Sequence, residues 1–244
     1  MKLHILAIAA HPDDVELGCA GTLIRHARKG QATGILDLTE GELGTRGTPA
    51  LRRAEAADAA AVMGAAVREN ARMADGFFRN DEEHQRRLIR YIREYRPEIV
   101  LANALADRHP DHGRAGRLIA DSCFLAGLRQ VKTQDDDGQE QEAWRPKRVF
   151  HMIQDRVHTP DIIVDISEVF STKMEAIRCY RSQFHDPGSA EPVTYISTPD
   201  FLRQIEYRDM LTGKQIGVDY AEGFVCENIP GVRDLDQLVY PALS

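Results

Sequence analysis

Short apolar runs alternate with longer segments of helical periodicity through the first half of this chain, and this alternation restricts its fold more than any other feature. The first run, residues 3–10 (LHILAIAA), is apolar at almost every position, which is typical of a parallel strand covered on both faces by helices. Alternating strands and helices build a mostly parallel sheet with helices on both faces. We therefore expect an α/β, Rossmann-like fold.

The expected elements follow the same rhythm along the chain. In the first half, strands and helices alternate over residues 3–10, 16–29, 32–38, 51–63, 66–72, 81–94, 98–103 and 114–128. After residue 147 we expect strands at 148–153 and 162–166, helices at 169–181 and 199–211, and an extended segment at 217–225. No repeat divides the chain, and 244 residues can bury one substantial core. Residues 1–244 are therefore expected to form a single domain.

Two similar motifs follow two of the predicted strands. His-Pro-Asp-Asp occupies residues 11–14, and His-Pro-Asp-His occupies residues 109–112. Open α/β sheets bind ligands at the carboxyl ends of their strands, so the two motifs are expected to meet there. Two imidazoles and one carboxylate match a catalytic zinc shell with one position left for water, and the same donors suit iron(II). The sequence therefore predicts a metal site at this edge of the sheet.

Helix capping is the alternative explanation of both motifs. Asp13, Asp14 and Asp111 could cap helices while the prolines shape the turns. Capping needs no imidazole, however, and His-Pro-Asp recurs at two strand ends, which favours the metal site. The residues alone leave open which of the two adjacent aspartates would hold the metal and which would act as a base.

A dinucleotide site would need GxGxxG in the first strand-to-helix turn, where backbone approaches a pyrophosphate. Here Gly18 and Gly21 fall within the predicted helix, and Asp13 and Asp14 would repel phosphate. These positions argue against NAD as a cofactor.

Composition restricts the class of partner. The net charge is −7 and no basic stripe is present, which argues against nucleic acid. No apolar stretch of 18 residues exists, and the N-terminus does not resemble a signal peptide, so we expect a cytoplasmic protein without a membrane span. The four cysteines are scattered without a CxxC pair and are expected to be small buried hydrophobic side chains. The acidic segment 134–142 lacks the ligand spacing of a calcium loop and is expected to be a solvated loop.

The chain resembles the LmbE-like, or PIG-L, family of zinc-dependent N-deacetylases. The resemblance rests on HPDD near the N-terminus, on the segment TEGELGTRGTPALR at residues 39–52, and on HPDH after a strand. Further segments are similar to the branch that deacetylates N-acetylglucosaminyl malate in bacillithiol synthesis: residues 37–40, 51–52, 107–112, 165–167, 182–184 and 220–224. The resemblance implies a small N-acetylated amino-sugar substrate and, by analogy, a homo-oligomer, with a hexamer as the expected form.

The resemblance assigns roles within the motifs. His11, Asp14 and His112 are implied as the metal ligands, with Asp13 as the general base that could later protonate the leaving amine. His109 and Asp111 are expected to act as a pair in catalysis, the carboxylate holding a cationic imidazole that stabilises the oxyanion. The alternative for His109 is a buried hydrogen bond without a catalytic role.

Three further residues are candidate substrate contacts. Arg52 could bind a malate carboxylate through its guanidinium fork, although a solvated position at the start of a charged helix is the simpler interpretation. Tyr195 resembles a family tyrosine that reaches towards the tetrahedral intermediate, and Arg108 follows as a weaker candidate.

Two other functions remain compatible with these motifs. One is a different hydrolase on the same fold, either a thiol-conjugate amidase or a deacetylase of another N-acetylglucosaminyl compound. The other is a non-catalytic metal-binding or sugar-binding protein, which has no use for a base such as Asp13 beside an open metal position.

Overall fold

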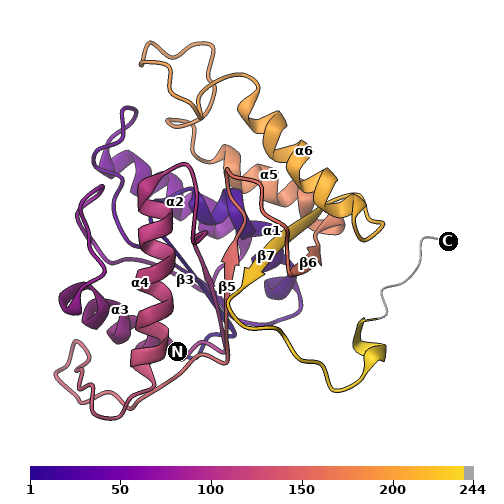
Figure 1. Ribbon diagram of the computed structural model, residues 1–244. Helices are drawn as coiled ribbons and strands as arrows, with labels where there is room; N and C mark the ends of the chain where they lie inside the picture. Colours follow the sequence, from indigo (N-terminus) through magenta and orange to yellow (C-terminus); the bar gives the residue numbers. More distant parts are fainter. Residues whose placement is uncertain (239–244) are drawn as a thin grey trace.

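One mixed sheet forms the centre of the protein in the computed structural model, which describes residues 1–238 (Figure 1). Its seven strands lie in the order β3-β2-β1-β4-β5-β7-β6. They span Ile5–Ala9 (β1), Thr33–Asp37 (β2), Val67–Asn70 (β3), Ile99–Ala102 (β4), Arg148–Met152 (β5), Ile162–Asp165 (β6) and Ala221–Cys226 (β7). The first five strands run parallel, whereas β7 is antiparallel to both of its neighbours.

Six α-helices accompany this sheet within the described residues. They span Asp14–Arg28 (α1), Pro49–Met63 (α2), Glu82–Tyr95 (α3), Pro110–Ala126 (α4), Phe170–Arg178 (α5) and Phe201–Lys214 (α6), with short 3₁₀ turns at Ser167–Val169 (η1) and Leu235–Leu238 (η2). The predicted α/β fold with a mostly parallel sheet is confirmed. The reversed direction of β7 was not predicted, because the residues of an extended segment do not encode its orientation.

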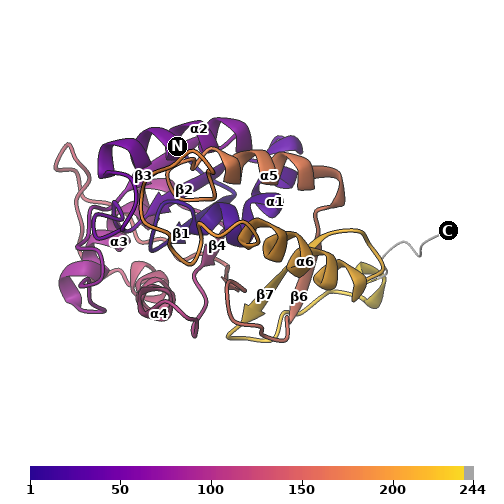
Figure 2. The same cartoon turned by 90° about the horizontal axis from the view of Figure 1, so that it is seen from above.

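The helices cover both faces of the sheet, as Figure 2 shows from above. Helices α1, α2 and α5 pack against one another on one face, and α3 packs on α4 on the other. Each face has its own apolar cluster, because alternate side chains of the central strands point in opposite directions: Ile5 and Ala7 belong to one cluster, and Leu6 and Ile8 to the other. None of the described helices has the length and apolar character needed to cross a membrane.

The pairing of β1 with β4 brings the two motifs together. Ile8 lies opposite Ala102 in the parallel register, so both strands end at the same edge of the sheet. The side-chain oxygen of Asn103 accepts a hydrogen bond of 2.8 Å from the backbone N–H of Ala10 and ties the two strand ends to each other. Residues 11–14 and 109–112 therefore emerge side by side.

Helix α6 is fastened to the rest of the fold by buried charges. Nζ of Lys173 on α5 lies 2.6 Å from Asp209 on α6 and 2.8 Å from Glu222 on β7, and none of the three side chains reaches solvent. The other carboxylate oxygen of Glu222 accepts the backbone N–H of Thr22 within α1. One buried cluster thus joins α1, α5, α6 and β7.

The prediction for the cysteines is only partly right, whereas the prediction for the acidic segment agrees with the structure. Cys19 and Cys123 are buried as expected, but Cys179 and Cys226 are only partly buried. In the acidic segment 134–142, the carboxylate of Asp135 accepts the backbone N–H groups of its own turn, in keeping with a solvated loop.

Candidate active site

Asp13 has an unusual backbone conformation at the start of α1. Its φ is +112°, in a region of backbone conformation that residues other than glycine rarely adopt. Its side chain makes no capping hydrogen bond. The capping explanation is therefore wrong for Asp13. Such a conformation costs about 1–3 kcal/mol and persists where the surrounding structure enforces it. Here it presents the carboxylate to the cavity described below instead of to the helix end.

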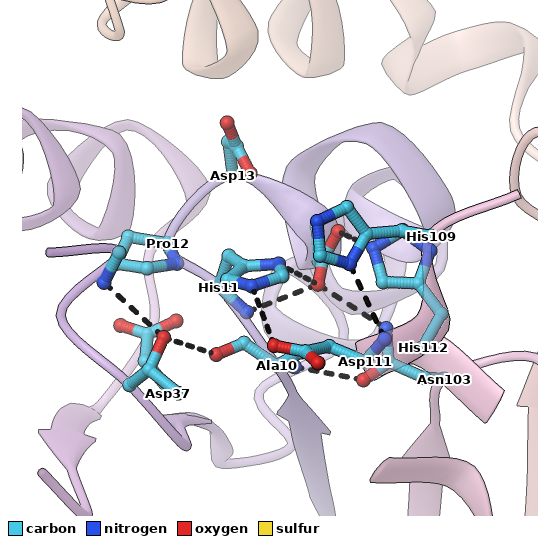
Figure 3. A network of polar contacts seen from close by, with 12 residues as sticks. Ala10, His11, Pro12, Asp13, Asp37, Asn103, His109, Asp111 and His112 are labelled. Atoms are coloured by element: carbon cyan, nitrogen blue, oxygen red, sulfur yellow. Dashed lines mark hydrogen bonds and ion pairs between the residues drawn. The ribbon is translucent and has the colours of Figure 1, made fainter. Parts of the chain in front are cut away.

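Asp14 lies between the imidazoles of the two motifs. Its carboxylate oxygens are 3.0 Å from Nε2 of His112 and 3.5 Å from Nδ1 of His11. Burial would raise the pKa of Asp14, but the adjacent His112 and His11 outweigh it and hold that pKa well below its usual value. Asp14 therefore remains an anion in this buried position. Figure 3 shows the neighbouring imidazoles of His11, His109 and His112 grouped at the end of β1.

In His11 and His112, the ring nitrogen that does not face Asp14 is hydrogen-bonded to another carboxylate. Nδ1 of His112 donates to Asp107, and Nε2 of His11 donates to Asp75 over 3.0 Å, with Asp111 at 3.4 Å. This leaves Nε2 of His112 and Nδ1 of His11 facing Asp14. Carboxylate partners of this kind fix the orientation of metal-binding histidines in proteins.

Amide groups hold the Asp14 carboxylate from the other side. Nδ2 of Asn103 lies 3.2 Å from one oxygen and Nε2 of Gln154 lies 3.1 Å from the other. The two amides are also bonded to each other, over 2.9 Å. The position of this carboxylate is therefore determined by three strand ends, those of β1, β4 and β5.

These donors fit a divalent cation. The three imidazoles of His11, His109 and His112 offer nitrogens within 4.8 Å of one another, and His11 forms a second such group with Asp75 and Asp111. Nitrogen and carboxylate donors without cysteine match catalytic zinc or iron(II) sites. The set His11, Asp14 and His112 stays a prediction, supported by the imidazole nitrogens of His11 and His112 that face the Asp14 carboxylate.

Asp13 and Arg52 form a buried pair beside this cluster. Nη2 of Arg52 lies 3.3 Å from the carboxylate of Asp13 and donates to the carbonyl of Pro12 over 2.6 Å. Burial raises the pKa of Asp13 to about 7, although the guanidinium of Arg52 opposes the shift. A carboxylate with a pKa near neutrality is suited to accept and return a proton.

The position of Arg52 differs from that expected of a substrate clamp. Its side chain is buried, Nη1 also donates to the carbonyl of Gly41, and Nε has no hydrogen-bond partner among the described residues. A Cβ at Gly41 would lie 1.8 Å from Nη1 of Arg52, and the φ of Gly41 is +65°, so only glycine fits there. Arg52 thus positions Asp13, and the predicted contact with a substrate carboxylate stays a prediction.

The predicted pairing of Asp111 with His109 is wrong. The Asp111 side chain accepts the backbone N–H of Gly76 over 2.9 Å and pairs with Arg114 and His11. Only its backbone N–H contacts His109, donating to Nδ1 over 3.3 Å. Burial and the two neighbouring imidazoles lower the pKa of His109, which favours the neutral form over the predicted cation. Neutral His109 then carries its proton on Nε2.

One cavity of about 640 Å³ contains most of these groups. Eight of the nine predicted site residues line it: His11, Asp13, Asp14, Arg52, Arg108, His109, His112 and Tyr195. The ninth, Asp111, is fully buried and contacts His11.

Arg108 and Tyr195 lie in the wall of this cavity as a pair. The guanidinium of Arg108 is 4.2 Å from the centre of the Tyr195 ring, and the Tyr195 hydroxyl donates to Asp155 over 2.7 Å. Nε of Arg108 lies 3.4 Å from the other oxygen of Asp155. Both predicted residues therefore line the site, but their polar groups are bonded to Asp155.

Comparisons with known proteins agree with this geometry. A family model described as PIG-L, GlcNAc-PI de-N-acetylase, matches residues 6–123. The diacetylchitobiose deacetylase of Thermococcus kodakarensis is 30% identical over 239 residues, which cover 93% of this chain and 84% of that protein. The chain belongs to the PIG-L family. This family includes metal-dependent N-deacetylases, and the donor set at the strand ends is compatible with that chemistry.

Two other relatives of this PIG-L protein are named for different reactions, one a hydration and the other a deacetylation. The 4-oxalmesaconate hydratase of Pseudomonas putida is 30% identical and covers 74% of each chain. A probable N-acetyl-alpha-D-glucosaminyl L-malate deacetylase of Bacillus subtilis is 26% identical, covering 75% of this chain and 84% of that protein.

Solved structures show the same PIG-L fold. A conserved protein from Thermus thermophilus superposes with a TM-score of 0.84 at 37% identity, covering 94% of this chain and 97% of its own. The N,N'-diacetylchitobiose deacetylase of Pyrococcus horikoshii superposes with a TM-score of 0.79 at 27% identity, covering 91% and 82%.

Sequence reasoning missed four residues of this PIG-L site: Asp75, Asn103, Asp107 and Gln154. Asp107 lies within the similar segment 107–112, and its place just before the second motif is a usable signal. Asn103 ends a predicted strand at the same edge. Asp75 and Gln154 are distant from both motifs, and only the tertiary structure brings them to the site.

Proposed function

We propose that this protein is a metal-dependent deacetylase that removes the acetyl group from an N-acetylglucosaminyl compound. The observation that carries the proposal is that two carboxylates line one cavity in different surroundings, Asp13 against Arg52 and Asp14 between two imidazoles. One carboxylate is suited to proton transfer and the other to a cation, which is the division of labour that amide hydrolysis needs.

His11, Asp14 and His112 would hold the metal, for which we propose zinc, with iron(II) as the alternative. A divalent cation there supplies an acidified water and polarises the acetyl carbonyl. Asp13 accepts the proton of the attacking water and passes it to the leaving amine nitrogen. Arg52 holds the Asp13 carboxylate in place. Nδ1 of His109 accepts a backbone N–H, so the neutral imidazole carries its proton on Nε2. That N–H would donate a hydrogen bond to the developing oxyanion.

The aglycone of the substrate is a separate question. The sequence resemblance predicts N-acetylglucosaminyl malate, and the name of the Bacillus subtilis relative supports that candidate. Arg52, which was expected to bind the malate carboxylate, donates hydrogen bonds to Pro12 and Asp13 instead. The structure therefore lends no support to malate through this residue. Malate therefore remains one candidate among N-acetylglucosaminyl compounds.

Hydration of an unsaturated polycarboxylate is the second candidate, since the Pseudomonas putida relative is named a hydratase. Addition of water to a carbon–carbon double bond also uses a metal and a base. A polycarboxylate would need several cations, whereas Arg52, Arg108 and Arg208 of the cavity are already paired with carboxylates of the protein. This pairing favours the deacetylase.

Acetate release by the zinc-loaded and iron-loaded protein tests the proposal. The substrates are N-acetylglucosamine, N,N'-diacetylchitobiose and the malate and inositol conjugates of N-acetylglucosamine, with loss of 4-oxalmesaconate absorbance measured in parallel. We expect acetate from at least one sugar and no hydration. Hydration without acetate release would identify a hydratase. Bound metal with neither reaction would contradict the proposal and direct attention to thiol-conjugate amides.

Cytoplasmic location and homo-oligomeric assembly are further proposals carried by the resemblance. Light scattering on the purified protein tests the expected hexamer, and a monomer at micromolar concentration would contradict it.

A further inference from the structure

The cavity extends well beyond the catalytic groups. His11, Asp13, Asp14 and His112 occupy the end that lies against β1 and β4. A second wall, the outer wall, is formed by α6 and by residues 153–160, which follow β5; within it, Gln154 reaches back to Asp14 over 3.1 Å. A volume of about 640 Å³ is that of a site for a drug-sized ligand, and one acetylated sugar ring leaves the outer part unfilled.

The outer wall carries a set of apolar side chains among its polar ones. The apolar ones include Ile153, Val157, Ile205, Tyr207 and Leu211, and Ile196 lines the same cavity. Val157 is 94% exposed, Leu211 is 65% exposed and Tyr207 is 51% exposed. Grouped apolar side chains that are left open to water mark binding surfaces in soluble proteins.

Most charged groups of this outer wall have partners within the protein. Arg208 donates to the carbonyl of Gln154 and pairs with Asp209, and Asp155 accepts a hydrogen bond from Tyr195. His158 donates to the carbonyl of Ala106. Arg156 adds one exposed cation at the rim. A polyanionic aglycone therefore finds little matching charge here.

The wall is also held firmly in place. Asp209 fastens α6 to the buried Lys173, and Arg208 of the same helix donates to the carbonyl of Leu17 in α1. A preformed apolar surface binds an apolar group without first having to be ordered.

We propose that the substrate carries an apolar alkyl or aryl group on its sugar, and that the outer wall formed by α6 and residues 153–160 binds this group. The inference rests on the proposed deacetylase function and names the class of aglycone. The apolar surface belongs to the same cavity as Asp13 and Asp14, so a substrate held at the catalytic groups extends onto it.

Paired glycosides test the inference. The zinc-loaded enzyme is assayed for acetate release from the methyl, hexyl and phenyl glycosides of N-acetylglucosamine and from its malate conjugate. We expect kcat/KM for the hexyl glycoside to exceed that for the methyl glycoside about tenfold or more, since each buried methylene adds to binding. The gain should lie in KM, because the aglycone contacts are the same in the ground and transition states.

The chain offers matched variants for this experiment. Leu211→Gln and Val157→Gln change cavity residues, whereas Met210→Gln and Val193→Gln change exposed apolar residues that do not line the cavity. The first pair should reduce the hexyl-to-methyl ratio of kcat/KM severalfold, and the second pair should leave it unchanged. Methyl glycoside turnover should stay the same in Met210→Gln and Val193→Gln, which change residues outside the cavity.

Three results would overturn the inference: equal kcat/KM for the methyl and hexyl glycosides, preference for the malate conjugate over both, or a Leu211→Gln variant that alters the oligomeric state but not the ratio. The last would identify the wall as a subunit contact. If no glycoside is hydrolysed, the proposed function fails. The dissociation constants of the hexyl and methyl glycosides for the Asp13→Asn variant, measured by calorimetry, then still decide whether the wall binds apolar groups.

Discussion

The pKa values of the adjacent Asp13 and Asp14 are shifted in opposite directions because the two side chains have different neighbours. The imidazoles of His112 and His11 keep the pKa of Asp14 low, whereas burial raises the pKa of Asp13 to about 7. Environments that separate the pKa values of two neighbouring carboxylates are typical of sites in which one group transfers a proton. At the scale of single residues, the site is therefore defined by contacts more than by residue type.

Single substitutions of Asp13 and Asp14 distinguish the proposed general base from the proposed metal ligand. We expect Asp13→Asn to keep bound metal while turnover falls about 10²- to 10⁴-fold, because a general base is removed. Asp14→Ala should lose metal, because the carboxylate between His11 and His112 is gone. Elemental analysis beside rate measurements checks both variants, and metal retained by Asp14→Ala but lost by Asp13→Asn would reverse the assignment.

Asp107 is expected to act on the metal through His112. Its carboxylate holds Nδ1 of that imidazole, so Asp107→Asn should weaken metal binding about 10- to 100-fold. Competition with a chelating dye measures the affinity. Asp136→Asn, in the exposed acidic loop, is the control and should bind metal as the unaltered protein does. Equal affinities of both variants would show that the Asp107 contact is not needed.

At the scale of elements, one buried cation fastens three of them. Lys173 on α5 contacts Asp209 on α6 and Glu222 on β7, and its removal leaves two carboxylates buried without it. Burying an unpaired charge is far more costly than losing an exposed ion pair. The placement of α6, and with it the outer wall of the cavity, depends on this contact.

Lys173→Met should therefore lower the free energy of unfolding by about 3–5 kcal/mol. Lys2→Met is a matched control, because Nζ of Lys2 lies 2.6 Å from Glu98, the same separation as in the Lys173–Asp209 pair, but its side chain is 57% exposed. The control should cost less than about 1 kcal/mol. Urea unfolding measures both, and similar losses for the two lysines would refute the structural role of burial.

At the scale of the whole molecule, the metal site joins distant parts of the chain. Its groups come from the ends of β1, β4 and β5, from the N-terminus of α4, and from the loop that carries Asp75. A ligand that binds only the folded state stabilises all of these segments together.

Metal should therefore raise the melting temperature of the protein, and chelation should reverse the change. At a free concentration 100 times the dissociation constant, the expected stabilisation is about 2.7 kcal/mol. Calorimetry with and without zinc measures the shift. Asp13→Asn should retain it and Asp14→Ala should lose it, while an equal shift in both would place the cation elsewhere.

Much of this architecture followed from local pattern. The apolar run at 3–10 and the helical segments after it predicted the parallel core, because periodicity reflects burial directly. The two motifs were placed at strand ends by the same pattern, and the β1–β4 pairing confirms that they meet. The candidate site residues within the two motifs, 11–14 and 109–112, could therefore be identified without a structure.

What the sequence by itself determined is the identity of the chemistry: histidines and aspartates directly after buried strands of an α/β sheet. The tertiary structure alone decided their partners. Asp75 and Gln154 reach the site from loops with no motif, Asp111 turns to His11 instead of His109, and Arg52 turns to Asp13. The physical reason is that periodicity reports which side chains are buried, whereas hydrogen-bond partners depend on the spatial approach of segments that are far apart in the chain.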